Sequence, residues 1–274
     1  MDGFSENIQF FFLILARAAG LIFIAPVLNT DSVGYRTRMM LAVLLSLLMY
    51  PAAVNYLPAL PGDPLNFGLA VLSQAFVGIT IGFMILVIFS AFQLTGEIFS
   101  MQMGISFSEV LDPQSNVSVP LLGTLKNTIG ILIFLYVPFV MDGQYVPAYL
   151  HMIRALGFSF AAIPELVPDT QTLGGILLYL DQAFGIMFLT AIKIGIPLIG
   201  ILFISSLMLG LLGRAAPQMN LMNMGIQLNI SVGVIVLMFL IPVMVPLMLE
   251  AFQVMYDRVG EMYSGWPRPG ATPQ

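Results

Sequence analysis

The sequence predicts an all-α fold: a polytopic helical membrane protein with broken, overlong helices and a C-terminal helical hairpin. Apolar residues make up 59% of the 274-residue chain and charged residues 8%, whereas roughly a quarter of a soluble domain is charged. The mean hydropathy is +0.97. Several apolar runs also reach the roughly 20 residues that a membrane-spanning helix needs. These features favour one polytopic unit.

Charge and composition exclude several classes of function. The net charge of -5 argues against nucleic acid as a partner, which requires a basic surface. Cysteine is absent and His151 is the one histidine, so thiolate metal sites and cysteine nucleophiles are excluded. We interpret His151 as a structural residue, and Glu97, Glu109 and Asp112 as solvated loop residues. We therefore expect no enzyme, no metal and no cofactor.

The first apolar run, residues 8–28, is predicted to be a retained helix, because a cleaved signal would begin with basic residues. Arg17 lies in the middle of this run. A charge at that depth costs roughly 2.5 to 3.5 kcal/mol unless it finds a partner. Arg17 is expected either to pair within the fold or to contact a partner subunit or a water path.

The next helices are a bent one over residues 39–57 and an unusually long one over residues 67–104. The 38 residues of the second would span about 57 Å at 1.5 Å per residue, nearly twice a hydrocarbon core of ~30 Å. The helix is therefore expected either to break near Gly82 or Gly96, or to stand partly outside the bilayer.

Small residues lie at four-residue steps along this long helix. Gly78 is followed by Gly82, and Gly96 by Ser100 and Gly104. Such ridges allow helix backbones to approach closely. We interpret them as helix-packing surfaces, with merely tolerated glycines as the alternative.

Residues 104–120 form the one long segment that lipid would reject. Asp112-Pro113 is a turn-forming pair, and serines, Asn116 and Pro120 leave no helical or strand periodicity. Unpaired backbone at membrane depth requires protein or water around it. The segment is therefore either an aqueous loop or a re-entrant element that lines or closes a path.

The rest of the chain is again apolar. Residues 121–141 form a run with Lys126 near its start, closed by Asp142-Gly143, and residues 145–160 are expected to form an interfacial or packed helix. Basic residues are divided almost evenly between the two sides of a six-span arrangement, so they leave the orientation open.

The last third is predicted to be a helical hairpin with arms over residues 173–212, which contain Lys193, and residues 225–256. Proline breaks a helix, so the first arm must end near Pro217. The tip is expected to be a structured junction or, as the alternative, a solvated turn. The tip residues of interest are Arg214, Pro217, Gln218 and Asn220.

Two motifs in this chain resemble those of a known family. Gly210-Leu-Leu-Gly-Arg-Ala-Ala-Pro-Gln-Met-Asn220 resembles the signature of the FliR family of flagellar export gate proteins, whose injectisome counterparts are called SctT. Gln102-Met-Gly-Ile-Ser-Phe107, with the residues that follow it, is similar to the family's central loop. Arg17 with Pro26 and the order of the apolar runs also fit. Asp142-Gly143-Gln144 departs from the Asn-Gly-His type of sequence common in the family.

The resemblance implies a core subunit of the flagellar type III protein export gate in the bacterial inner membrane and flagellar basal body. FliP and FliQ would be its partners in a channel for unfolded flagellar proteins, with FlhB and FlhA nearby. Residues 1–170 would be FliP-like, residues 171–263 a FliQ-like hairpin, and residues 264–274 a disordered tail. The family's loop plugs the closed gate; here it corresponds to Gly104, Phe107, Asp112, Pro113 and Pro120.

Other functions remain open on the sequence. One is an injectisome export gate subunit. A second is a small-solute secondary transporter, because the intramembrane charges Arg17, Lys126 and Lys193 and the polar midsection suit substrate coordination. Inverted repeats typical of transporters are not visible, and uptake by the purified protein would be needed to support that alternative. A membrane enzyme is the weakest option.

Overall fold

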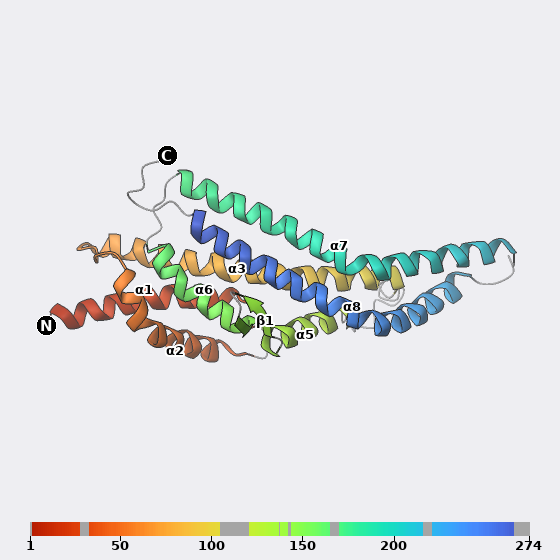
Figure 1. Ribbon diagram of the computed structural model, residues 1–274, viewed down its shortest axis with the longest axis horizontal. Helices are drawn as coiled ribbons and strands as arrows, with labels where there is room; N and C mark the ends of the chain where they lie inside the picture. Colours follow the sequence, from red (N-terminus) through yellow and green to blue (C-terminus); the bar gives the residue numbers. More distant parts are fainter. Residues whose placement is uncertain are drawn as a thin grey trace. The chain divides into compact units, whose positions relative to one another are not determined.

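Helices dominate the structure, a computed structural model drawn in Figure 1. It describes residues 2–27, 33–104, 121–136, 138–141, 144–164, 170–215 and 221–265. Its elements are α1 (Asp2–Ile24), α2 (Tyr35–Ala53), η1 (Val54–Tyr56), α3 (Pro64–Met103), α5 (Leu121–Tyr136), β1 (Pro138–Met141), β2 (Gln144–Pro147), α6 (Ala148–Ala162), α7 (Thr170–Ala215) and α8 (Leu221–Gly265). The predicted all-α class is confirmed.

Five of these helices, α1, α2, α3, α7 and α8, are long and apolar enough to cross a membrane. Their lengths confirm the prediction of overlong helices: α3 has 40 residues, α7 has 46 and α8 has 45. At 1.5 Å per residue α3 measures about 60 Å. It is continuous, so the predicted break near Gly82 or Gly96 is not there. α7 and α8 also continue through their internal prolines.

A short antiparallel hairpin, β1 with β2, corrects the prediction for residues 138–147. Pro138 lies opposite Pro147, and Phe139 opposite Val146. Aromatic and β-branched residues favour strands, and the prolines lie at the end of the ladder, where a missing N–H costs least. The helix within the apolar run of residues 121–141 therefore ends at Tyr136, and α6 begins at Ala148 instead of near residue 145.

The chain divides into two compact units. The first consists of Met1–Ile88, Val137–Gly185 and Gln253–Gln274, and the second of Phe89–Tyr136 and Ile186–Phe252. The division predicted from family resemblance, at residue 170, rests on a different criterion and stays a prediction.

In the first unit α1 packs against α2, and α2 packs against α6 (Figure 1). The Tyr50 hydroxyl, near the end of α2, donates to the Asn7 side-chain oxygen near the start of α1 at 3.1 Å, so the two helices are antiparallel. Leu13, Ile14 and Leu21 line the buried side of α1 with at most 2% exposure. Arg17 lies on this same buried side, fully buried.

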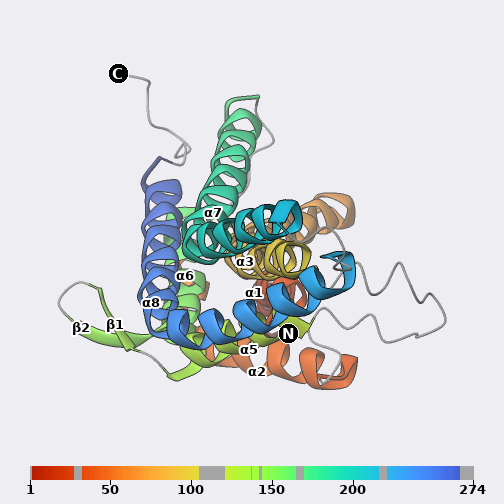
Figure 2. The same ribbon diagram turned by 90° about the vertical axis from the view of Figure 1, so that its right-hand side faces the viewer.

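In the second unit a cluster of four phenylalanines joins α3, α5 and α8. Phe252 lies 5.7 Å from Phe89, 5.7 Å from Phe92 and 5.9 Å from Phe134, between ring centroids. Offset and edge-to-face rings at these separations attract one another. The α7 and α8 segments of this unit form the predicted hairpin (Figure 2).

Candidate functional site: a buried arginine junction

Arg17 of α1 is the centre of a buried polar junction in the first unit. Its Nε donates to Gln74 Oε1 of α3 at 2.8 Å. Its Nη1 donates to Ser159 Oγ of α6 at 3.0 Å, and its Nη2 to the Ile163 carbonyl just after α6 at 2.6 Å. The planar guanidinium, which presents several donors in a fixed arrangement, thus joins three helices that are far apart in the sequence.

The charge of Arg17 is stabilised by neutral groups. Its guanidinium carbon lies 4.3 Å from the centre of the Phe160 ring, a geometry that favours a cation. Within the described part of the chain the guanidinium forms no ion pair. Directed hydrogen bonds and the ring face therefore offset its loss of hydration.

Gln74 extends the junction to the end of α6. While its oxygen accepts from Arg17, its Nε2 donates to the Pro164 carbonyl at 2.8 Å. The carbonyls of Ile163 and Pro164 lie beyond the last turn of α6, where helical donors run out. Arg17 donates to the Ile163 carbonyl and Gln74 to the Pro164 carbonyl. The C-terminal end of α6 is therefore fixed to α1 and α3.

Glycines allow α1 and α3 to approach closely enough for these bonds. A Cβ atom at Gly78 of α3 would collide with the Arg17 carbonyl, and one at Gly20 of α1 with the Ala75 carbonyl. A Cβ at Gly82 would lie 2.9 Å from the Leu21 carbonyl. The backbones of α1 and α3 thus approach closely at Gly78 and Gly82, while the helix-packing role proposed for the ridges stays a prediction.

Two tyrosines attach the end of α8 to α6. The Tyr256 hydroxyl donates to the Ala148 carbonyl at 2.7 Å, and the Tyr263 hydroxyl to the Ala155 carbonyl at 2.8 Å. Both spacings are seven residues in the same direction, so the two helices run parallel here. The His151 ring lies 5.4 Å from the Tyr256 ring, a packed position in keeping with a structural histidine.

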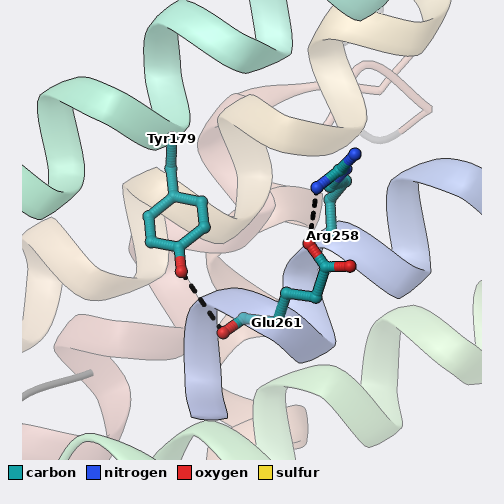
Figure 3. A network of polar contacts seen from close by, with 3 residues as sticks. All are labelled: Tyr179, Arg258 and Glu261. Atoms are coloured by element: carbon teal, nitrogen blue, oxygen red, sulfur yellow. Dashed lines mark hydrogen bonds and ion pairs between the residues drawn. The ribbon is translucent and has the colours of Figure 1, made fainter. Parts of the chain in front are cut away.

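The start of α7 is held to the same part of α8. The Tyr179 hydroxyl donates to the Glu261 carbonyl at 3.3 Å, and the Glu261 side chain pairs with Arg258 at 2.6 Å. Figure 3 shows these three residues together. Both members of this ion pair are about half exposed. The last turns of α8 are thus held by α6 and α7.

The predicted plug residues lie mostly outside the described residues. Phe107, Asp112, Pro113 and Pro120 belong to that part of the chain. Gly104, just after α3, has φ 78°, a left-handed conformation that glycine adopts without strain and that commonly ends helices. Long helix α3 therefore stops where the polar segment begins.

The hairpin tip is described only at its start. Arg214 is exposed in the last turn of α7, where a cation favours the negative end of the helix dipole. Pro217, Gln218 and Asn220 lie outside the described residues. The junction role proposed for the tip stays a prediction.

The remaining predicted residues differ in burial. Unlike Arg17, Lys193 is not buried by this chain: its side chain is 52% exposed and its Nζ lies 3.4 Å from Glu250 Oε1. Lys126 lies in α5, but its side chain is not among those that the structure describes. Gly96 is buried and Ser100 half-buried on α3.

Sequence reasoning missed the partners of the charges. Gln74 and Ser159 are single polar residues in apolar helices, and only the fold brings them to Arg17. Glu250 could have been found, because it is the one charged residue of the arm over residues 225–256 and is opposite in sign to Lys193. Among the described residues no group of three His, Cys, Asp or Glu side chains could hold a metal. The buried junction joins α1, α3 and α6.

Known proteins similar to this chain cover nearly all of it. The family model of the bacterial export proteins, family 1, matches residues 8–255. The flagellar biosynthetic protein FliR of Pectobacterium carotovorum is 30% identical over 256 residues, 92% of each chain. That of Escherichia coli is 30% identical over 263 residues, 95% of each chain. The surface presentation of antigens protein SpaR of Salmonella typhimurium is 26% identical over 226 residues, 82% of this chain and 80% of SpaR.

The two motifs, the overlong helices and these full-length matches agree with one another. The matched region contains Arg17, Gln74 and Ser159 of the buried junction as well as the hairpin. This chain therefore belongs to the bacterial export proteins, family 1, the FliR family that its motifs resemble.

Proposed function

We propose that this chain is a core subunit of the flagellar type III protein export gate. The match to full-length proteins named FliR, over 92% and 95% of each chain, carries the proposal. In this role it would form, with FliP and FliQ, the channel through which unfolded flagellar subunits cross the bacterial inner membrane. FlhA and FlhB would be neighbouring export proteins. The role requires no catalysis and no cofactor.

The surface of the chain supports a role inside an assembly. Only 22% of the spanning windows of α7 and α8 is buried by the chain itself, and Phe203, Leu211 and Phe239 are 58%, 65% and 79% exposed. Helices of about 60 Å also exceed a ~30 Å hydrocarbon core. Other subunits that extend beyond the membrane would cover this apolar surface. Residues 171–263 would form the FliQ-like part and residues 1–170 the FliP-like part.

We also propose that residues 104–120 close the gate at rest. The support is their polar, turn-rich sequence between apolar helices and their similarity to the family's plug loop.

The decisive experiment combines assembly with export. Co-expression with FliP and FliQ from the same bacterium, followed by native mass measurement, should give one complex that contains all three chains. Removing this chain should abolish motility and flagellar protein secretion, and restoring it should recover both. A monomer that takes up a small solute by itself would instead favour the transporter.

An injectisome role is the second candidate, favoured by the similarity to SpaR. The FliR relatives are more similar and cover more of the chain, so we place the flagellar role first. Secretion of virulence proteins with normal motility in a strain lacking this chain would reverse the order.

A further inference from the structure

Two polar links hold the arms of the hairpin, α7 and α8, together. At the base link, Lys193 Nζ of α7 lies 3.4 Å from Glu250 Oε1 of α8. At the tip link, Ser205 Oγ of α7 donates to Asn229 Oδ1 of α8 at 2.9 Å, and Asn229 Nδ2 donates to Ser206 Oγ at 3.3 Å. The arms are therefore paired at two separate levels.

The two arms differ in length between these links. Ser205 comes 12 residues after Lys193 on α7, whereas Glu250 comes 21 residues after Asn229 on α8. At 1.5 Å per residue these stretches measure about 18 Å and about 32 Å. The long side chains of the base link can bridge part of this difference. The rest requires α8 to curve away from α7 between the links.

Prolines interrupt both arms between the links. Pro197 lies in α7, and Pro242 and Pro246 lie in α8. Because proline has no N–H, the carbonyl four residues before each of them has no helical donor. Pro197 comes four residues after Lys193 and Pro246 four residues before Glu250, so both arms are weakened at about the same level. Sharp changes of helix direction occur mostly at such positions.

The space between the arms at this level is incompletely filled. A small apolar cavity lies there, lined by Ile194 of α7 and, among others, by Ile241, Met244 and Val245 of α8. Dense packing would resist a change in helix direction. A cavity beside a flexible methionine side chain instead allows the arms to repack.

The outer side of the same turns is open. Pro242 and Pro246 are exposed, and the neighbouring Ile196 and Val243 are 58% and 51% exposed. A cavity on the inside and an exposed surface on the outside distinguish this level of the hairpin from a proline kink that packing holds in one position. The chain therefore leaves room for both arms to bend here.

We propose that the three prolines form a hinge at which the tip side of the hairpin, residues 198–215 and 221–241, changes direction during export. The base link and the tip link keep the arms together, so both arms bend as one. Hinges of this kind absorb large backbone changes at a few residues. The use of the hinge in export rests on the proposed function, whereas the bending is a property of the chain itself.

The first test measures the width of the distance distribution across the hinge. The chain has no cysteine, so Leu189→Cys with Leu207→Cys introduces just two spin labels. Both positions are exposed on α7, and they lie 18 residues apart, on either side of Pro197. The control pair, Ile79→Cys with Glu97→Cys, has the same spacing on α3, which has no internal proline. In the complex with cysteine-free FliP and FliQ, we expect the α7 distribution to be about twice as wide as the α3 distribution.

The second test removes the hinge. Replacing all three prolines by alanine returns the missing N–H donors and favours a helix. We expect the α7 distribution to narrow to the α3 width and the recovery of the complex to be unchanged. Flagellar protein secretion should fall about threefold or more, because a stiff hairpin slows the change of shape that export requires. The control is Pro51→Ala, which removes a proline inside α2 and should change neither the α7 distribution nor secretion.

A wild-type α7 distribution as narrow as that of α3 would overturn the hinge, as would one that stays wide in the alanine variant. Normal secretion by a variant whose α7 distribution has narrowed would overturn its use in export. If the chain does not assemble with FliP and FliQ, the proposed function fails, and the same two distributions measured on the purified chain alone still decide whether the hairpin bends.

Discussion

Replacing Arg17 tests whether the buried junction depends on the shape of the guanidinium or on its charge. Arg17→Lys keeps a cation but loses the planar group that reaches Gln74 Oε1, Ser159 Oγ and the Ile163 carbonyl together. Arg17→Met removes the charge and retains much of the volume. The two variants separate the two explanations.

The magnitude follows from the contacts. Either variant leaves two or three buried acceptors without a donor, each costing roughly 1–3 kcal/mol. The stacking on Phe160 at 4.3 Å adds about 2 kcal/mol when desolvated. Methionine also removes the desolvation penalty of a buried charge, several kcal/mol, whereas lysine retains it. We therefore expect a net loss of about 2–3 kcal/mol for methionine and at least as much for lysine.

The assay is the thermal midpoint of the detergent-purified complex. At roughly 2–4 °C per kcal/mol for domains of 150–250 residues, methionine should lower the midpoint by about 4–12 °C, and lysine by no less. Arg36→Met is the control, because Arg36 is exposed on α2, and it should have little effect. A lysine variant as stable as wild type beside an unstable methionine variant would show that charge alone matters.

Four further predictions concern other contacts. Gly78→Ala forces a Cβ onto a carbonyl of α1 and should lower the thermal midpoint by several degrees, whereas Gly68→Ala, with open space around it, should not; equal effects would contradict the close packing. Tyr263→Phe loses a 2.8 Å hydrogen bond and should cost about 1 kcal/mol, seen as faster proteolysis of the α8 end; unchanged proteolysis counts against the attachment. Deleting residues 108–118 should leave assembly intact but let ions leak across the membrane. Ion permeability equal to that of the wild type would show that the plug assignment is wrong. Arg214→Lys should reduce complex recovery and secretion if the hairpin tip is a structured junction. Full export by this variant would support the solvated turn instead.

The sequence predicted the helical class, the overlong helices and the hairpin correctly because these depend on composition and run length. Lipid requires apolar helices of a minimum length, and that requirement is visible in any window of the chain. Arg17 was recognised as needing a partner for the same reason: a lone charge in an apolar run is costly wherever the run packs.

The partners of Arg17 could not be predicted, because they depend on which helices meet. Gln74 and Ser159 lie 57 and 142 residues away in the sequence, and many polar residues were equally eligible. The β1–β2 hairpin was missed for a different reason. An Asp-Gly pair between apolar stretches favours a hairpin, whereas a long apolar run such as residues 121–141 is also typical of a membrane helix.

The positions of the polar contacts suggest how an apolar chain specifies one arrangement. Leucine and isoleucine pack against lipid nearly as well as against one another, so apolar faces alone define helix pairing weakly in a membrane. In the first unit Arg17 connects α1, α3 and α6, and Tyr256 and Tyr263 connect α6 with α8. Each contact pairs groups that lipid cannot satisfy, so a shifted register would leave donors and acceptors unpaired. The few polar residues therefore select the arrangement of the helices, while the glycines permit the close approach.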